Sequence, residues 1–438
     1  MPTAPVDCVV VGAGVAGLAA AAELRRLGRS CLLLEAGSRI GGRAWTTHPP
    51  ALGGAVFDHG ASWLHQAEGN PLVSIARAAG DPLRSADGLR EWRTYVGSRL
   101  ADAEELAAYD RAEATLRAAL AERAEGAQAD VSLAEAAASF AADPWTRTVL
   151  AWEGLIAAAD PGCLSLRDWH LNSLAGGNLL VEGGLGRFVA ARLGAAAGPV
   201  RLATPVQRIS WQEPGGTVTI GTPHGDITAG SCIVTVSTGV LAGGGIVFAP
   251  ALPAPVEEAV HALPMGLLTK VALRATGPDR LDLPASCAVD RQVGPGETLM
   301  SLHFWPGGAD HVVGFVAGAT AWDLAREGDA APAAFCRDTL RTLFGARADR
   351  LFAGDAAVVT GWGLDPLTRG SYCYAVPGQA AARSLLAQPL ADGRLVFAGE
   401  ACHSRLGGTV GGAYLSGKAA VGLSCANAPA RPGVGCPG

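Results

Sequence analysis

The chain has 438 residues, more than one ordinary hydrophobic core accommodates, so we expect two domains or one elaborated domain. Because 49% of the residues are hydrophobic and only 17% are charged, the composition indicates a well-packed globular protein and excludes a largely disordered chain. The formal net charge of -6 provides no basic surface for nucleic acid or an anionic membrane, so we expect neither partner.

The ten cysteines form no CxxC pair and no regular framework. Cys8 and Cys31 fall in apolar, strand-like runs, which favours reduced, buried thiols in a cytosolic protein. A strand begins at Val6, leaving no room for a signal peptide, and no apolar run reaches the roughly 20 residues of a transmembrane helix. We therefore predict a cytoplasmic protein without membrane contact, as a monomer or homodimer.

The N-terminal segment predicts a βαβ unit. Val6–Val11 has the pattern of a buried strand, Gly12–Gly17 that of a glycine turn, and Leu18–Leu27 that of an Ala/Leu-rich helix. A second apolar strand is predicted at Ser30–Glu35. A unit of this kind builds a parallel sheet.

Further elements are predicted along the rest of the chain. Residues 101–142 are rich in Ala, Glu and Arg at helical spacing and predict amphipathic helices of a second domain. The later predictions are strands at Val200–Ile209, Thr217–Ile220 and Cys232–Val236, strands of a different sheet at Gly266–Arg274 and Thr298–Phe304, a strand at Leu395–Ala398, and a helix at Gly412–Leu423.

The glycine turn has the GxGxxG pattern of a dinucleotide-binding loop. Gly12 permits the tight turn, Gly14 lets the backbone approach a pyrophosphate, and Gly17 allows the helix to pack closely on the strand. The helix N-terminus then offers free N–H groups to the phosphates. Glu35 follows at about the 20-residue spacing at which a carboxylate accepts hydrogen bonds from ribose hydroxyls. Strand, turn, helix and acidic residue together predict a bound dinucleotide.

A second glycine turn indicates which dinucleotide binds. After Glu35 and Ala36 the chain continues to Arg39-Ile40-Gly41-Gly42-Arg43. A guanidinium forms bidentate contacts to phosphate oxygens, so Arg43 suits the far side of a pyrophosphate. An NAD-dependent dehydrogenase needs no second cradle of this kind, whereas extended, buried FAD does. The sequence therefore predicts FAD.

With these motifs in place, the sequence resembles the flavin-dependent amine oxidase family, which includes monoamine oxidases, polyamine oxidases and flavin histone demethylases; the pattern is closest to a bacterial-type flavin monoamine oxidase. Five blocks in the family's order carry the resemblance: the GxGxxG unit ending at Glu35; Arg39–Arg43; Asp58–Trp63; Leu268–Val271; and a C-terminal pair, Trp362–Tyr372 and Phe397–Val410.

The resemblance implies cofactor contacts along the chain. The segment of Gly60, Ala61, Ser62 and Trp63 would pass beside the flavin ring. Glu400, after Gly399, would hydrogen-bond the ribityl or pyrophosphate region. Thr409 and Val410 would lie at the pyrimidine side, where the following helix stabilises negative charge. Val206 would contact the adenine, and Trp362 would pack near the flavin.

The resemblance also assigns two catalytic residues. Lys270 lies in an apolar strand, where a surface-reaching side chain is the ordinary expectation. The family's corresponding lysine holds a water near flavin N5, which implies that Lys270 aids flavin reduction or the O2 reaction. Tyr372 would stand over the substrate side of the flavin and orient the amine. Trp63, His65 and Thr409 are the substrate-site candidates.

Departures from the family pattern refine these expectations. Members with covalent flavin carry cysteine where this chain has Tyr372, and Cys373 is offset, so we predict non-covalent FAD. Thr409 replaces the second aromatic of the monoamine-oxidase cage, a threonine that animal-type polyamine oxidases and histone demethylases share. Trp63-Leu64-His65 also resembles the animal-type polyamine oxidases, although Val410-Gly411-Gly412 has glycine where they usually have histidine. These features of the resemblance slightly favour a polyamine or another secondary amine as the substrate.

The predicted fold is α/β, with α+β character overall: a Rossmann-like FAD-binding domain and a discontinuous substrate domain of mixed sheet plus helices. Cofactor signatures occur at both ends of the chain, so each domain is expected to be assembled from separate segments. We assign residues 1–65, 186–262 and 389–425 to the FAD domain, 66–185 (helical) and 263–388 to the substrate domain, and 426–438 to a disordered tail.

The implied function is oxidation of a small-molecule amine to an imine by hydride transfer to flavin N5, with O2 reduced to H2O2. An L-amino-acid oxidase, or a related monooxygenase or desaturase, remains an alternative and requires an arginine for the substrate carboxylate, for which Arg77, Arg187 and Arg274 are candidates. A non-catalytic FAD-containing binding protein is an alternative of another class. No metal site is predicted, and lone polar residues near the channel (Asp160, His170 and Glu182) are more often structural.

Overall fold

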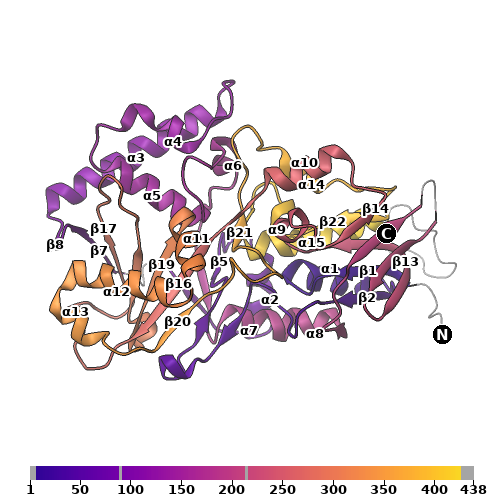
Figure 1. Ribbon diagram of the computed structural model, residues 1–438, viewed down its shortest axis with the longest axis horizontal. Coiled ribbons are helices and arrows are strands. Elements are labelled where there is room, and N and C mark those ends of the chain that lie inside the picture. Colours follow the sequence, from indigo (N-terminus) through magenta and orange to yellow (C-terminus); the bar gives the residue numbers. More distant parts are fainter. Residues whose placement is uncertain (1–5, 88–90, 213–215, 426–438) are drawn as a thin grey trace.

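The computed structural model describes residues 6–87, 91–212 and 216–425. Two large sheets lie toward opposite ends of an elongated molecule, each covered by helices (Figure 1). This arrangement confirms the predicted mixed α/β fold. The predicted tail at 426–438 lies outside the described residues, and the proposed domain boundaries stay a prediction.

Within the described residues, the first sheet has eight strands in the order β10-β2-β1-β13-β12-β11-β14, with β22 also paired to β13. Strands β10, β2, β1, β13 and β22 run parallel, whereas β12 is antiparallel to both of its neighbours. The strands are β1 (Val6–Val11), β2 (Cys31–Leu34), β10 (Val200–Arg201), β11 (Arg208–Trp211), β12 (Val218–Thr222), β13 (Gly225–Val234), β14 (Val247–Ala249) and β22 (Leu395–Phe397).

The βαβ unit forms as predicted. Strand β1 has the predicted bounds, and helix α1 (Val15–Arg26) begins three residues earlier than expected because Gly14 already serves as its N-cap. Helix α15 (Val410–Cys425) likewise begins two residues before the predicted start and packs against α1. Helices α1 and α15, which are far apart in the sequence, thus lie side by side next to the first sheet (Figure 1).

One predicted strand was wrong. Val200–Ile209 is divided into β10, which pairs with β2, and β11, which pairs with β12. Pro205 lies between them and lacks the N–H group that a continuous strand would need. The interrupted backbone carries Val206 to the cavity wall described below.

The second sheet has the order β20-β16-β19-β18-β17-β7-β8 and is antiparallel apart from the β17–β7 pair. It contains both predicted strands of a different sheet. Its strands are β7 (Glu91–Val96), β8 (Arg99–Leu100), β16 (Leu268–Arg274), β17 (Cys287–Arg291), β18 (Ser301–Phe304), β19 (His311–Ala317) and β20 (Ala357–Val359).

The alternation of side chains along β16 and β19 divides this sheet into two faces. Val271 and Leu273 pack in one cluster with Leu340 of α12 (Ala330–Phe344), whereas Ala272 and Phe315 pack in another with Leu155 of α5 (Thr146–Ala157). Because side chains in a strand alternate, Lys270 shares the face of Ala272.

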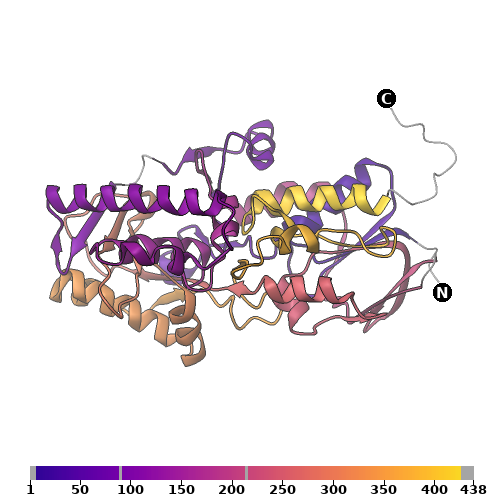
Figure 2. The ribbon, with the colours of Figure 1, turned by 90° about the horizontal axis from the view of Figure 1, so that it is seen from above.

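A helical segment covers this second face. It comprises α3 (Ala103–Glu125), α4 (Leu133–Ala136), α5 and α6 (Leu166–Leu171). Figure 2 shows α3 on the opposite side of the molecule from α12 and α13 (Ala346–Leu351). Asp102 and Glu105 form a capping box at the start of α3, and Leu116 and Leu120 turn its apolar side inward. The predicted helices within 101–142 are confirmed.

Among the described residues, no helix combines the length and apolarity needed to cross a membrane.

Shorter elements connect these layers. The remaining strands are β3 (Thr46–Thr47), β4 (Phe57–Asp58), β5 (Trp63–Leu64), β6 (Leu83–Ser85), β9 (Leu179–Val181), β15 (Met265–Gly266) and β21 (Tyr372–Cys373). The remaining α-helices of the described residues are α2 (Pro71–Ala78), α7 (Leu185–Phe188), α8 (Gly194–Ala197), α9 (Thr238–Ala242), α10 (Ala254–Ala262), α11 (Gly318–Glu327), α13 (Ala346–Leu351) and α14 (Ala382–Leu386).

Candidate active site

A cavity of about 1100 Å³ is lined by residues from both sheets and from the helical segment. It brings together site candidates that are distributed along the chain from Gly12 to Val410. Those lining it are Gly12, Gly14, Glu35, Ala36, Arg43, Gly60, Ala61, Ser62, Trp63, His65, Val206, Lys270, Trp362, Tyr372, Gly399, Glu400, Thr409 and Val410.

The glycine turn at one end fits a dinucleotide phosphate. Gly12 has φ +98°, a conformation that favours glycine. Gly17 does not line the cavity. A Cβ atom there would lie 1.8 Å from the Gly12 carbonyl oxygen, so Gly17 allows the close packing beneath the turn. A Cβ on Gly14 would meet no protein atom within 4 Å. Gly14 therefore leaves open space at the N-terminus of α1, where phosphate is stabilised.

Glu35 closes the same end of the cavity. Its carboxylate accepts hydrogen bonds from the backbone N–H groups of Ala13 (2.7 Å) and Gly37 (2.8 Å). Each carboxylate oxygen has a second lone pair, so the group stays able to accept bonds from ribose hydroxyls. Val206 is buried in the cavity wall. The residues present fit the adenosine half of a dinucleotide.

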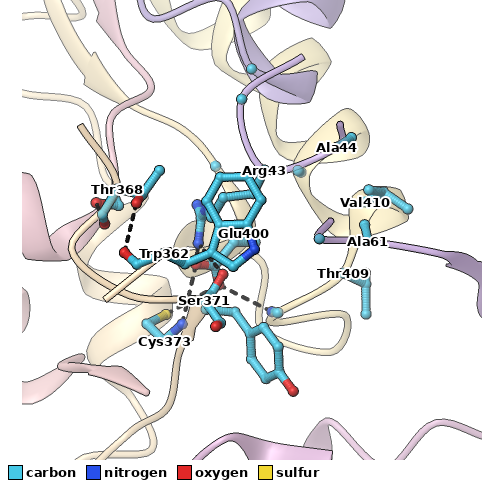
Figure 3. A pocket seen from close by; sticks show the side chains of 18 of the residues that line it. Arg43, Ala44, Ala61, Trp362, Thr368, Ser371, Cys373, Glu400, Thr409 and Val410 are labelled. Carbon is cyan, nitrogen blue, oxygen red and sulfur yellow. Dashed lines mark hydrogen bonds and ion pairs between the residues drawn. The ribbon is translucent and has the colours of Figure 1, made fainter. Parts of the chain in front are cut away.

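Two predicted cofactor residues contact each other further along the cavity. Arg43 Nη1 donates to Glu400 Oε1 (2.9 Å) and to the Ser371 carbonyl oxygen (2.8 Å), as Figure 3 shows. Glu400 also accepts from the backbone N–H of Cys373 (3.2 Å) and of Gly408 (3.1 Å). Burial alone would raise the pKa of Glu400. The positive charges of Arg43 and Arg383 outweigh this effect and lower the pKa below its usual value, so the carboxylate stays ionised.

Lys270 is buried at the face of β16 that borders the cavity. Its Nζ donates to the carbonyl oxygens of Asp58 (2.8 Å) and Gly60 (2.6 Å) and to Ser62 Oγ (2.7 Å). The side chain does not reach the surface, and it ties β16 to the segment expected beside the flavin. Burial lowers the pKa of Lys270 to about 8, although the charge of Asp58 opposes this shift.

Aromatic rings surround this lysine. The ring centroids of Trp63 and Phe315 lie 5.7 and 5.8 Å from Lys270 Nζ and 6.2 Å from each other. His303 adds a third ring, 4.7 Å from that of Phe315. On another strand, Tyr372 donates from its hydroxyl to the Ile156 carbonyl oxygen (2.7 Å), which fixes the ring within the cavity wall. This part of the cavity is suited to an amine with apolar substituents.

Several polar residues considered from sequence lie elsewhere. Asp160 accepts from the backbone of Ala319, and His170 pairs with Glu125. The lining does not include Asp160, His170, Glu182, Arg77, Arg187 or Arg274.

Sequence reasoning missed charged residues that do line the cavity. Glu153 is buried on α5, accepts from Trp169 Nε1 (2.8 Å) and pairs with Arg117 (2.7 Å). Asp168 and Arg383 form another buried pair. The pairs come from residues 36 and 215 positions apart, so no local motif signals them.

Comparison with known proteins agrees with this geometry. A family model described as flavin containing amine oxidoreductase matches residues 15–423. Lysine-specific histone demethylase 1 homolog 2 of Oryza sativa subsp. japonica is 32% identical, with 93% of this chain and 55% of that protein covered. Polyamine oxidase 3 of the same organism is 30% identical, with 94% and 87% covered. The chain spans about half the length of the histone demethylase homologues that it matches.

A solved structure supports the fold. The cyclohexylamine oxidase from Brevibacterium oxydans IH-35A has a TM-score of 0.78 at 23% identity, with 96% of this chain and 99% of that chain covered. The family match confirms the predicted flavin cofactor, and the two glycine turns fit FAD. The chain belongs to the family of flavin containing amine oxidoreductases.

Proposed function

We propose that this chain is a FAD-dependent amine oxidase that uses O2 as electron acceptor and holds FAD without a covalent bond. The observation that carries the proposal is the continuity of one cavity from Gly12 and Gly14 to Lys270 and Tyr372. Such a cavity joins a glycine turn that fits a phosphate to an aromatic region that suits an amine. Membership in the amine oxidoreductase family supports the same reaction class.

FAD held along Gly14, Glu35 and Arg43 would supply an acceptor for hydride from the amine α-carbon and a route for the electrons to O2, giving H2O2. Overall, amine, O2 and water become an aldehyde or ketone, the released amine or ammonia, and H2O2. Tyr372, fixed by its bond to Ile156, orients the amine. Lys270 holds Gly60 and Ser62 in place through its hydrogen bonds. It also contributes positive charge near the flavin ring, where electron density would increase during reduction. The surrounding rings exclude water, so positioning supplies much of the acceleration.

For the substrate we propose a polyamine or another secondary amine. Thr409, Trp63 and His65, whose pattern resembles polyamine oxidases, all line the cavity. Similarity to a polyamine oxidase over 94% of the chain supports this choice.

An amino-acid oxidase or a related monooxygenase or desaturase is less well supported. A substrate carboxylate needs a cationic partner, and Arg77, Arg187 and Arg274 do not line the cavity. Arg117 lines it but already pairs with Glu153. A non-catalytic FAD protein would not require Lys270 and Tyr372 at one cavity.

A turnover assay tests the proposal. We expect O2 consumption and equimolar H2O2 release with spermine, an N-alkylamine or a benzylic amine, and none with the matching amino acids. Oxidation confined to amino acids would transfer the assignment to the amino-acid oxidases. The apo-protein without added FAD is the control for adventitious oxidation.

The pH dependence of flavin reduction gives a second prediction. A protonated amine has no lone pair to assist hydride loss, so only the neutral form reacts. The anaerobic reduction rate constant should therefore rise with pH through a pKa that follows that of the amine. A series of amines of different basicity checks this by stopped-flow absorbance, and a pH-independent rate would contradict the mechanism.

The mode of cofactor attachment is a third prediction. The Cys373 thiol contacts Glu400 (3.2 Å) inside the protein, and Tyr372 occupies the aligned position of the attached cysteine. We expect heat or acid denaturation to release all the FAD, measured by absorbance of the supernatant after the protein is pelleted. Flavin that stays with the denatured polypeptide would contradict this prediction.

A further inference from the structure

A buried ion pair joins the helical segment to the C-terminal part of the chain at the cavity wall. Arg383 Nε and Nη2 donate to Asp168 Oδ1 (2.7 Å) and Oδ2 (3.0 Å) in a bidentate arrangement. The two side chains are only 3% and 8% exposed, so solvent does not screen them. Neither residue takes part in the chemistry proposed above.

Asp168 connects α6 to two segments of the cavity. Its Oδ2 accepts from the Ala375 N–H (3.1 Å), two residues beyond β21. Its Oδ1 accepts from Asn172 Nδ2 (2.9 Å), and Asn172 Oδ1 in turn accepts from the Gly407 N–H (2.7 Å). Asp168 and Asn172 therefore hold both the strand that carries Tyr372 and the loop that precedes α15.

Arg383 contacts the same two segments. Its Nη2 donates to the Cys373 carbonyl oxygen (3.1 Å), next to Tyr372 in sequence. Its guanidinium lies against Gly407, because a Cβ there would be 2.6 Å from Arg383 Cζ. The following residue, Gly408, donates its N–H to Glu400.

The ion pair contributes more to the relative positions of the segments that it joins than to the free energy of unfolding. Replacing a buried ion pair by apolar residues of similar volume is often neutral or stabilising, whereas removing one partner is costly. Here the pair aligns Tyr372 with Thr409 and Val410, the residues at the start of α15. A helix N-terminus stabilises negative charge only within its first turn, so its position matters.

We propose that Asp168 and Arg383 are positioning residues that set the placement of Tyr372 relative to the N-terminus of α15, and thereby the alignment of amine and flavin. This inference deepens the proposed function and rests on it. Tyr372 orients the amine and α15 stabilises the reduced cofactor, so the ion pair would affect both the reduction rate and the flavin midpoint potential.

The double substitution Asp168→Leu/Arg383→Met tests the proposal without leaving a buried charge unpaired. We expect the variant to fold and to bind FAD with a lower Tm, because the buried Ala375 N–H and the Cys373 carbonyl oxygen lose their partners. It should also show a more negative flavin midpoint potential. Amine-dependent flavin reduction should be slower by roughly tenfold to a hundredfold, the cost of a misplacement of about 1 Å. A merely structural role would change Tm and leave the potential unaltered.

The matched control is Asp81→Leu/Arg192→Met, which removes another bidentate Arg–Asp pair, with both distances 2.8 Å, outside the cavity lining. Its potential and reduction rate should equal those of the wild type. Asn172→Ala provides a second, milder variant, expected to shift the potential in the same direction by removing the bond to Gly407.

The outcomes separate this inference from the proposed function. An unchanged potential and unchanged reduction rate in both Asp168→Leu/Arg383→Met and Asn172→Ala would overturn the positioning role while amine oxidation by the wild type stands. A wild type that no amine reduces would refute the proposed function, and a potential shift in the variants would then still support positioning of the cofactor. If the double variant does not fold, the potential of Asn172→Ala decides.

Discussion

Gly17→Ala is expected to weaken FAD binding strongly. The added Cβ would lie 1.8 Å from the Gly12 carbonyl oxygen and 3.0 Å from Thr235 Oγ1, so α1 must move away from β1. Forcing a methyl group into such a site costs about 1–3 kcal/mol. Every 1.4 kcal/mol by which this cost destabilises the FAD-bound form more than the apo-protein weakens FAD binding about tenfold. Titrating apo-protein with FAD should show a dissociation constant higher by roughly a hundredfold, together with a lower Tm.

Two further alanine substitutions separate cofactor contact from stability. Gly14 has extended backbone angles that alanine adopts, and its Cβ would project into open cavity. Gly14→Ala should therefore change the apo-protein's stability by about 1 kcal/mol or less, yet weaken FAD binding. Gly162→Ala, which also meets no atom within 4 Å but lies outside the cavity lining, should change neither. Equal FAD affinity for wild type and Gly14→Ala would contradict the proposed phosphate cradle.

Lys270→Met is expected to retain FAD but to slow amine oxidation by roughly a hundredfold to a thousandfold, the usual effect of losing a preorganised group at a developing charge. Methionine has a similar length and no donor, so the bonds to Asp58, Gly60 and Ser62 are lost together. Stopped-flow measurement of reduction and reoxidation locates the affected step. Activity within threefold of the wild type would show that Lys270 has no catalytic role.

The sequence offers a matched control and a direct probe for this residue. Lys270 and Lys418 are the two lysines among 34 basic residues. Lys418→Met alters a partly exposed side chain of α15 and should leave turnover unchanged. In that variant one lysine signal remains, and NMR of ¹³Cε-labelled lysine should show it titrating near pH 8, since burial lowers the pKa of Lys270 to about 8. A pKa near 10.5 would contradict the buried position.

Local patterns in the sequence correctly predicted those elements whose start and end signals lie within or next to the element. Strand β1, with its glycine turn and following helix, was recognised because apolar residues, Gly12 and Gly17 lie within a short window. The segment 200–209 was misassigned because its apolar residues satisfy a strand pattern on both sides of Pro205, and only the pairing with different partners divides it. Long-range pairing of this kind leaves no local signal.

The same distinction applies to the cavity. Residues of family motifs, such as Lys270, Tyr372 and Glu400, were identified from their neighbours in sequence, and all three line the cavity. Asp168 and Arg383 were not predicted, because their role depends on a contact between residues 215 positions apart in the sequence. Lys270 also illustrates the limit of segment-level reasoning, since an apolar strand alone favours a lysine that reaches the surface, whereas three acceptors from the Asp58–Ser62 segment bind it inside.

The measurement that tests the central claim most directly is the anaerobic visible spectrum of the purified protein, recorded before and after each of several amines and amino acids is added. We predict a flavin band that a polyamine, an N-alkylamine or a benzylic amine bleaches and that returns when O2 is admitted. A band bleached by amino acids alone would assign the chain to the amino-acid oxidases. A protein that takes up no FAD, or whose flavin no amine reduces, would contradict the account.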